Sequence, residues 1–405
     1  MKRLTWLGLI VVAMMAHIGC STYTNVTYSK AERKTYNPAF FMDREGDLYP
    51  PGEVYVDRQG VLGPGIRKRS AHLKGYYRRQ AEAQSADWAA LVRATGITPT
   101  TDFDRDWTAI QAHLRARAIA LFQHGPDEDV LLVVHGFNND FEDADEWIDV
   151  LDRDIRERRP RTRVVRMYWD GLARDVPIGI WAKAQFNGPP VGHGLRRILN
   201  QLDPGTRLRI LTHSSGAFVV TNALGDGSAS FGGFEDKHWR PEVAQRAGAA
   251  QGDYTIPSQL TDLRVAMLVP AQPANAFDRF VRRTTQGTEL HGAIPRRLVL
   301  GTSRTDEATS KLRTRCGWFG ATCMATEPEQ ACDAIRRALS LPDRSPSVAI
   351  IDFPAPINQR YHPHGVVSYM QDMAEWNELM RQLFGPEPAG TMEAQVVAGA
   401  ATACV

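Results

Sequence analysis

The serine at position 214 stands in a sequence context that can make its hydroxyl a nucleophile. Residues 207–211 alternate between polar and apolar side chains, Thr-His-Ser-Ser-Gly follows at 212–216, and residues 217–224 have the pattern of a buried helix. Strand, x-x-Ser-x-Gly and helix in this order favour a turn so tight that the serine side chain is exposed at the carboxyl end of its strand. The helix behind it supplies backbone N–H groups and a positive dipole end. A hydroxyl alone is a weak nucleophile, so a base and an orienting acid are expected elsewhere.

A second turn has the features needed to stabilise a developing negative charge. Residues 133–139 read Val-Val-His-Gly-Phe-Asn-Asn and end the first clear strand of the chain. The backbone N–H groups of Phe137 and Ser215 are expected to form a two-donor oxyanion hole, in which each donor is worth about 3 kcal/mol. His135 is expected to fix this turn through hydrogen bonds, and His213 to pack against the sheet.

The elements around these residues predict a three-layer α/β architecture. Short apolar runs alternate with helical segments, and their near-continuous apolar character indicates a mostly parallel sheet that is buried on both faces. In such a sheet the active site lies at the carboxyl edge of the strands. The expected strands are Val130–Val134, Arg163–Trp169, Leu208–Leu211, Leu263–Val269, Arg297–Leu300 and Val348–Ile351.

The rest of the chain divides by composition. Residues 70–123 carry helical periodicity and predict an N-terminal helical extension, whereas residues 171–194 and 225–261 are rich in glycine and break the strand–helix pattern. These two segments could be lids, substrate-binding loops or tolerated insertions. The predicted division is an export signal at 1–20, a tether and helical extension at 21–124, the α/β domain at 125–390 and a C-terminal tail at 391–405.

The first twenty residues have the pattern of an export signal. Basic residues at 2–3 precede an apolar run of about a dozen residues, which is too short for a comfortable membrane span. Cys20 stands where bacterial lipoprotein signals carry the cysteine that is lipidated and becomes the new N-terminus. An ordinary cleaved signal and an uncleaved anchor are the alternatives. We expect an exported cell-envelope protein, held on a membrane of the periplasm or outer membrane through lipidated Cys20.

Composition bears on the partners of the chain. Of its 405 residues 43% are hydrophobic and 23% charged, and the formal net charge is +2, so no nucleic-acid partner is expected. Besides Cys20 the chain has an even number of cysteines, which favours disulfides in an oxidising compartment, although their pairing stays open. The lack of C-x-x-C pairs argues against a metal site. The cysteines concerned are Cys316, Cys323, Cys332 and Cys404.

The two turns together resemble those of the α/β-hydrolase superfamily. Leu-Val-Val-His-Gly-Phe-Asn-Asn-Asp-Phe-Glu-Asp-Ala at 132–144 and Thr-His-Ser-Ser-Gly at 212–216 are most similar to a bacterial branch of esterase/lipase-like proteins of mostly unassigned function. In that branch the blocks typically read V-H-G-Y-N-N-x-F-E-D-A and A-H-S-M-G. The resemblance covers roughly residues 125–385. It implies a three-layer α/β-hydrolase fold whose catalytic residues follow in the order serine, acid, histidine.

The acid is then expected after a late strand. Asp306 follows the expected strand Arg297–Leu300 and is the chosen candidate, although an aspartate there could instead cap a helix over 307–312. Asp262 and Asp278 flank the preceding strand and are weaker alternatives.

The histidine is expected after the final strand. The segment Tyr-His-Pro-His-Gly at 361–365 offers two, and a helix should begin near Val366. His364 lies in His-Gly-Val-Val-Ser-Tyr and best resembles the Gly-His-Ser-Tyr segment of the branch, whereas Pro363 restricts the backbone of His362. His364 is therefore the candidate base, with His362 as the alternative.

These residues predict a serine hydrolase that cleaves carboxylic esters, with a small-molecule or lipid ester as substrate. His364 would take the proton of Ser214, Ser214 would attack the acyl carbonyl, and Asp306 would orient the imidazole. Water would then cleave the acyl-enzyme, and neither a metal nor an organic cofactor is expected. The same residues also suit acyl transfer and amide or thioester cleavage. The alternative is a catalytically inactive hydrolase-fold lipoprotein that binds or scaffolds components of the cell envelope.

Overall fold

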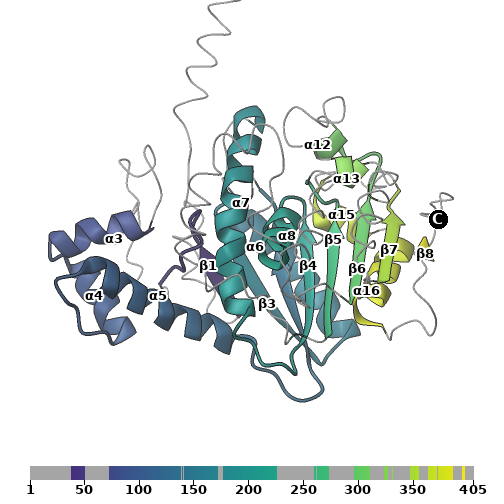
Figure 1. Cartoon of the computed structure of the whole chain (residues 1–405). Helices are drawn as coiled ribbons and strands as arrows, with labels where there is room; N and C mark the ends of the chain where they lie inside the picture. The colour runs from purple at the N-terminus through teal and green to yellow at the C-terminus, as the bar shows by residue number, and fades with distance from the viewer. Residues whose placement is uncertain are drawn as a thin grey trace, which may run out of the picture.

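The computed structural model of the chain places eight strands in one all-parallel sheet (Figure 1). Helices pack on both of its faces. This arrangement confirms the predicted α/β class, because parallel strands need helical crossovers that cover the sheet. The structure describes residues 38–50, 73–137, 139, 141–171, 177–225, 260, 262–272, 296–310, 323–326, 331, 347–354, 364–371, 373–385 and 395–396.

The apolar runs in the sequence correspond to six of the strands, and each observed end lies within two residues of its predicted position. These strands are almost fully buried, as near-continuous apolar runs require. Two short edge strands, one at each end of the chain, were not predicted. The strands are β1 (Ala39–Met42), β2 (Asp129–Val134), β3 (Thr162–Trp169), β4 (Arg207–His213), β5 (Asp262–Leu268), β6 (Arg297–Thr302), β7 (Ser347–Asp352) and β8 (Gln395–Val396).

The order of the strands creates a switch point at the centre of the sheet. The order is β1-β3-β2-β4-β5-β6-β7-β8, so the chain passes from β2 to β3 on one side and then returns across β2 to β4 on the other. In open parallel sheets, ligands bind outside the carboxyl ends of the strands where the winding reverses in this way. The ends of β2 and β4 are therefore the expected place for a site.

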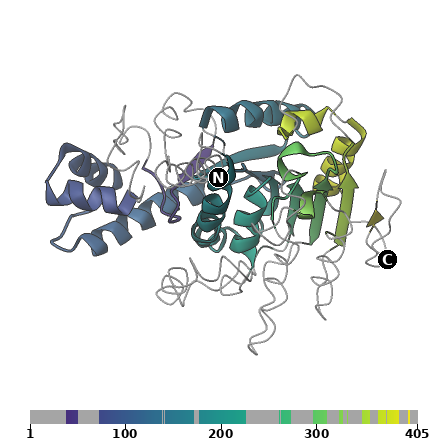
Figure 2. The same ribbon diagram turned by 90° about the horizontal axis from the view of Figure 1, so that it is seen from above.

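The helices form one layer on each face of the sheet (Figure 2). One layer packs on β3, β5, β6 and β7, and the other packs on β2 and β4. The first layer consists of α6 (Phe141–Arg158), α15 (Val366–Met370) and α16 (Met373–Phe384); the second contains α7 (Pro177–Leu199) and α8 (Gly216–Leu224); the short α12 (Glu307–Ser310) and α13 (Cys323–Thr326) follow β6.

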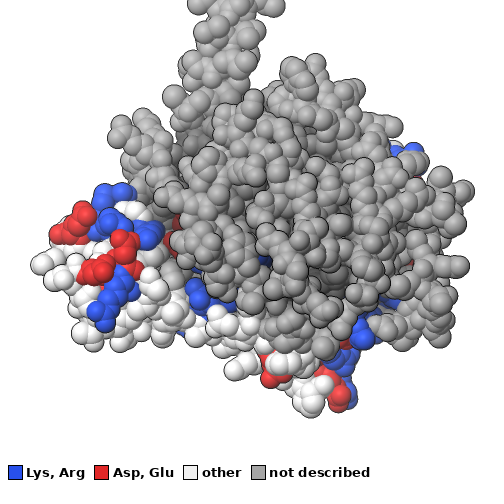
Figure 3. Space-filling model, in the orientation of Figure 1, with Lys and Arg blue, Asp and Glu red and all other residues white. Residues whose placement is uncertain are grey.

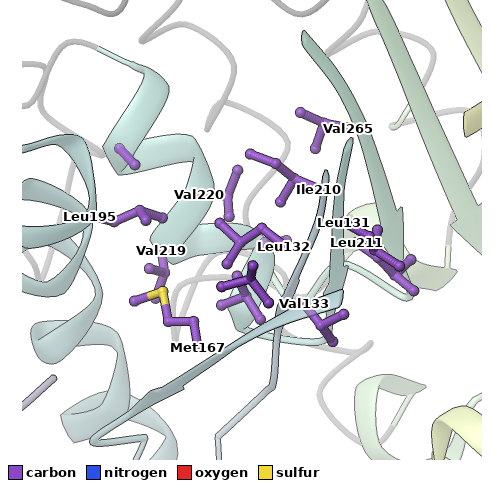
Figure 4. Packing of buried hydrophobic residues seen from close by; sticks show 14 of the residues in the cluster. Leu131, Leu132, Val133, Met167, Leu195, Ile210, Leu211, Val219, Val220 and Val265 are labelled. Atoms are coloured by element: carbon purple, nitrogen blue, oxygen red, sulfur yellow. The ribbon is translucent and has the colours of Figure 1, made fainter. Parts of the chain in front are cut away.

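One part of the core lies between the sheet and α8 (Figure 4). Leu132, Ile210 and Val265 stand opposite one another on neighbouring strands and form one apolar row across the sheet. Val219 and Val220 of α8 pack near this row, and all five side chains are fully buried. Burial of each such side chain stabilises the fold by about 1.5–3 kcal/mol. This packing holds the start of α8 against the ends of the central strands.

The glycine-rich segment 171–194 is largely helical, which corrects the prediction that it breaks the strand–helix pattern. The helix α7 runs through Pro189 and Pro190. Tertiary packing outweighs the low helix propensity of these residues. A Cβ atom on Gly192 would lie 2.8 Å from a backbone carbonyl oxygen of α8, so the absence of a side chain lets the two helices approach closely.

The N-terminal extension is helical, as predicted, and lies beside the β1 edge of the sheet (Figures 1 and 2). It consists of α3 (Leu73–Glu82), α4 (Ala86–Thr95) and α5 (Phe103–Ala120). Side-chain oxygens of Ser85 and Asp102 accept backbone N–H groups at the starts of α4 and α5, which stops each helix from fraying. On its surface, basic and acidic side chains lie side by side (Figure 3), as where Lys74 and Arg78 both pair with Asp104.

Part of the predicted tether belongs to the sheet, which corrects the interpretation of residues 21–50. Ala39–Met42 pairs with β3, and the buried carboxylate of Asp43 then accepts the backbone N–H groups of Glu45, Asp47 and Leu73. Asp43 thereby joins the turn after β1 to the start of α3. The strand was missed because four residues are too few to show a clear period.

Several predictions fall on residues that the structure does not describe. They include the export signal with Cys20 and nearly all of the segment 225–261. None of the helices in the described ranges is long and apolar enough to cross a membrane. Among the other cysteines, Cys316, Cys332 and Cys404 also lie outside the described residues, so the predicted disulfides stay a prediction.

An arginine is buried between β3 and α6. The side chain of Arg166 is 1% exposed, and its guanidinium lies 2.6 Å from Asp145, 2.7 Å from Asp149 and 3.0 Å from Asp152. These three aspartates lie on one face of α6, so the arginine ties that helix to the sheet.

We expect Arg166→Met to lower the free energy of unfolding by roughly 3–5 kcal/mol, because it leaves buried carboxylates without their cation. Arg381→Met removes the exposed pair with Glu378 and should lower it by less than about 1 kcal/mol. Urea unfolding followed by circular dichroism measures both. Equal effects of the two substitutions would contradict the assignment of Arg166 as a buried cross-link.

Candidate active site

Ser214 occupies a strained turn between β4 and α8. Its φ angle is +52°, in the left-handed region that residues other than glycine rarely adopt. The end of β5 holds this conformation, because the Ser214 N–H donates to the carbonyl of Leu268 at 3.0 Å and the Ala271 N–H donates to the carbonyl of Ser214 at 3.1 Å. Such strain costs on the order of 1–3 kcal/mol and persists only where the surroundings enforce it. The predicted tight turn is therefore present.

Close packing surrounds this serine. A Cβ atom on Gly216 would lie 2.5 Å from the carbonyl oxygen of Val134, so only glycine allows α8 to start so near the end of β2. The predicted exposure of the serine is wrong, since Ser214 is 1% exposed. The turn after β2 covers it, as the 2.8 Å separation between a hypothetical Cβ on Gly136 and the Ser214 Cβ indicates.

His135 fixes the turn after β2, as predicted. Its Nε2 accepts the backbone N–H of Trp169 at 3.0 Å, its Nδ1 lies 2.7 Å from the carbonyl oxygen of Gly136, and its own carbonyl accepts the indole N–H of Trp169 at 2.7 Å. Because Nε2 accepts, the proton is on Nδ1. Burial lowers the pKa of His135 to about 4, so the ring is neutral. A neutral imidazole with both nitrogens engaged is a structural element rather than a proton carrier.

The two residues predicted to form an oxyanion hole lie next to each other. The backbone N–H of Phe137 donates to the hydroxyl oxygen of Ser215 at 3.3 Å. Ser215 is the N-cap of α8, so its own amide is one of those that the helix leaves without an intrahelical partner. The amide of Phe137 therefore lies beside the side chain of Ser215, at the switch point of the sheet.

Asp306 is fully buried after β6 and holds several donors. One carboxylate oxygen accepts the backbone N–H of Thr309 at 2.8 Å and also its hydroxyl; the other accepts the hydroxyl of Tyr369 and lies 2.7 Å from Nδ1 of His364. Helix capping and histidine binding were weighed as alternatives, and Asp306 does both through different oxygens.

The surroundings of Asp306 keep it ionised. Burial raises the pKa of its carboxyl, but the charge of His364 and the hydrogen bonds from His364, Thr309 and Tyr369 together outweigh burial and hold this pKa below its ordinary value of 3.8. A buried carboxylate in contact with Nδ1 sets the orientation of the imidazole and leaves its Nε2 for other partners.

Of the other acid and base candidates, the structure describes only Asp262. Asp262 lies at the amino end of β5, where it pairs with Arg209 at 2.7 Å and with Arg264 at 3.2 Å. That is the opposite edge of the sheet from Ser214, so Asp262 is excluded as the orienting acid. Asp278 and His362 lie outside the described residues.

The hydrogen bond between serine and histidine is not formed. The Ser214 hydroxyl oxygen is buried and has no hydrogen-bond partner among the described residues. The structure thus joins Asp306 to His364 and places the main chain of His364 beside residue 213, whose Nε2 lies 2.8 Å from the His364 carbonyl oxygen. In enzymes without bound substrate, catalytic hydrogen bonds are often long and tighten only when substrate binds.

Two side chains that the sequence analysis did not single out complete this arrangement, since Tyr369 and Thr309 bind the Asp306 carboxylate. Trp169 has a structural role, because its backbone N–H and its indole N–H both donate to His135. The tyrosine lies on α15, which begins two residues after His364, so its closeness in sequence was a usable signal. Within the described ranges, no cluster of histidine, cysteine and acidic side chains could hold a metal ion.

We expect Asp306→Asn to destabilise the fold in a pH-dependent way. A carboxyl whose pKa is lower in the folded state contributes stability above its unfolded pKa, near 3.8, and this contribution is lost as the pH falls toward the folded value. The gap in unfolding free energy between wild type and variant should be roughly 2 kcal/mol or more at pH 6 and should shrink below about pH 4. Asp104→Asn, at an exposed ion pair, should change stability by less than about 1 kcal/mol. A pH-independent gap for Asp306→Asn would exclude the ionised carboxylate.

Comparison of the chain with known protein families, with curated proteins and with solved structures finds no match to any of them. Function must therefore be inferred from Ser214, Asp306 and His364 and from the fold that positions them.

Proposed function

We propose that this chain is a serine hydrolase of the α/β-hydrolase type, which cleaves carboxylic esters through an acyl-enzyme on Ser214. The observation that carries the proposal is the contact of 2.7 Å between Asp306 and Nδ1 of His364, whose main chain lies against His213, the residue before a serine with a φ of +52°. Nucleophile, acid and base follow in the chain order of that superfamily. They follow the carboxyl ends of β4, β6 and β7, and of these strands β4 borders the switch point of the sheet.

In the proposed reaction, His364 removes the proton of Ser214 through Nε2 while the serine oxygen attacks the acyl carbon. The step requires the hydroxyl to turn toward His364. The hydroxyl has no partner among the described residues, so this rotation breaks no existing hydrogen bond. Asp306 stabilises the imidazolium that forms, and His364 then returns the proton to the leaving alcohol. Attack by water on the acyl-enzyme, through the same base, completes the cycle.

The amides of Phe137 and Ser215 are proposed to hold the oxyanion. Preorganised donors stabilise the charge that develops on the carbonyl oxygen, and each is worth about 3 kcal/mol. The Phe137 N–H now donates to the Ser215 hydroxyl over 3.3 Å, which is long for this type of bond. An oxyanion would accept this N–H more strongly than a neutral hydroxyl does.

The substrate is proposed to be a small-molecule or lipid ester. The proposal that Cys20 anchors the chain to a membrane of the cell envelope rests on the sequence, because Cys20 lies outside the described residues. A lipid anchor would keep the site near lipid esters.

The burial of Ser214 favours a second candidate function. With 1% of the serine exposed, the same fold could serve as a catalytically inactive binding or scaffolding lipoprotein. We favour the enzyme because serine, acid and histidine candidates are all present and follow in the chain order of the superfamily, which binding alone does not require.

Labelling with a fluorophosphonate probe tests the proposed function. Attack by the Ser214 oxygen forms an O–P bond and releases fluoride, so we expect one covalent adduct on Ser214, located by peptide mass spectrometry. Ser214→Ala should abolish labelling, and His364→Ala should slow it by roughly 10³-fold or more, since the serine loses its base.

Ser85→Ala is the matched control, because it removes a helix-capping hydroxyl in the N-terminal extension and should leave the labelling rate unchanged. An unlabelled wild type whose circular dichroism shows a folded chain would favour the scaffold. An adduct on Ser215 in place of Ser214 would contradict the assigned nucleophile.

A further inference from the structure

His213 links the candidate nucleophile to the candidate base. It is the last residue of β4, directly before Ser214, and it is buried. Its Nε2 lies 2.8 Å from the carbonyl oxygen of His364, and the centroids of the two imidazole rings are 4.6 Å apart. Because a carbonyl oxygen can only accept, Nε2 of His213 carries a proton and donates it to this bond.

The surroundings keep this imidazole neutral. Burial lowers the pKa of His213, and the neighbouring charge of His364 lowers it further, to about 3. A neutral ring with its proton on Nε2 has an unprotonated Nδ1, and this atom has no hydrogen-bond partner among the described residues. The Nε2–H donor is therefore present throughout the neutral pH range.

His364 is held at two points. Asp306 binds its side chain at Nδ1, and His213 binds its main-chain carbonyl. The second contact is made by His213, the residue directly before Ser214 in the chain. Because residue 213 precedes Ser214 in the chain and its ring is buried, this hydrogen bond opposes movement of the His364 main chain away from Ser214.

Packing alone does not account for a histidine at this position. The ring does contact Trp147 of α6 in an edge-to-face arrangement, with the two ring centroids 6.0 Å apart. An apolar side chain could make that contact without leaving the Nδ1 atom buried and unpaired, which is unfavourable. The directed hydrogen bond to His364 is the feature that only a donor can supply.

We propose that His213 is a positioning residue, which fixes the main chain of His364 relative to Ser214 so that the base meets the serine hydroxyl. The inference rests on the proposed function, in which His364 is the base. It goes beyond the expectation that His213 only packs against the sheet. A displacement of about 1 Å between reacting groups can slow a reaction by roughly 100-fold, so such a contact has a measurable effect.

A matched pair of substitutions isolates the hydrogen bond. His213→Gln keeps an N–H donor at the end of a side chain of similar length, and His213→Met has a similar shape without a donor. Both lose the ring contact with His364, so their difference reports the donor alone. The readouts are the maximal rate of fluorophosphonate labelling, the probe concentration at half-maximal rate, and the midpoint of thermal unfolding.

We expect the maximal labelling rate of His213→Met to fall about tenfold, with His213→Gln recovering most of it, because one hydrogen bond is lost and regained. The half-saturating probe concentration should be unchanged in both. A glutamine variant no faster than the methionine variant would overturn the proposal, as would a loss of rate that follows the unfolding midpoint in both.

Nuclear magnetic resonance of the unaltered chain, labelled with ¹⁵N-histidine, gives a second test that needs no substitution. We expect the His213 ring to be neutral, with a slowly exchanging proton on Nε2, from about pH 5 to 9. A proton on Nδ1, or a charged ring, would overturn the proposal. If wild type is not labelled at Ser214, the proposed function fails, whereas the resonance still reports the contact with His364, so the two failures are distinguishable.

Discussion

The close approach of two turns is the constraint on which the rest of this structure depends. A Cβ atom on Gly216 would lie 2.5 Å from the Val134 carbonyl oxygen, and one on Gly136 would lie 2.8 Å from the Ser214 Cβ. Both distances are shorter than any ordinary contact, so the turns after β2 and β4 meet only because both positions are glycine. The same approach sets the amide of Phe137 beside residue 215. Two glycines thus bring together Phe137 and Ser215, which are 78 residues apart in the sequence.

Charge burial provides the second level of organisation. Asp306 has no exposed surface, yet its pKa is held below the ordinary value because donors from three segments converge on it. Exclusion of water strengthens each of those hydrogen bonds. It also means that the loss of any one donor lowers the stability of the fold more than it would at the surface. The carboxylate therefore locks the turn after β6, the start of α12 and the histidine before α15 into one arrangement. The arginine between β3 and α6 follows the same logic on the other side of the switch point, with three aspartates on one cation.

The sequence predicted what depends on local pattern and chain order, and it missed what depends on contact between distant segments. Parallel strands buried on both faces leave long apolar runs, so the central strands were predicted closely. The helix α7 was missed because Pro189 and Pro190 oppose it locally, while its packing against α8 comes from elsewhere in the chain. Asp306 and His364 were predicted from their order after the serine. The hydrogen bond between His213 and His364 was not predicted. The two residues are 151 positions apart, and hydrophobic periodicity carries no information about contacts at such a separation.

The unsatisfied groups at the end of β4 argue for a site under functional constraint. Thr212, His213 and Ser214 each keep a buried polar side-chain atom with no hydrogen-bond partner among the described residues, and no other run of three consecutive described residues does so. Each such atom costs about 1–3 kcal/mol, and the strained backbone of the serine adds to this. Selection for stability alone would remove these groups, since apolar side chains fit a buried strand end better. A hydroxyl that is already bonded must first give up its partner before it can pass a proton to a base. An unpaired hydroxyl at a strained turn is therefore unfavourable for the resting fold and favourable for a nucleophile, and natural sequences depart from local rules in this way mainly where the chemistry requires it.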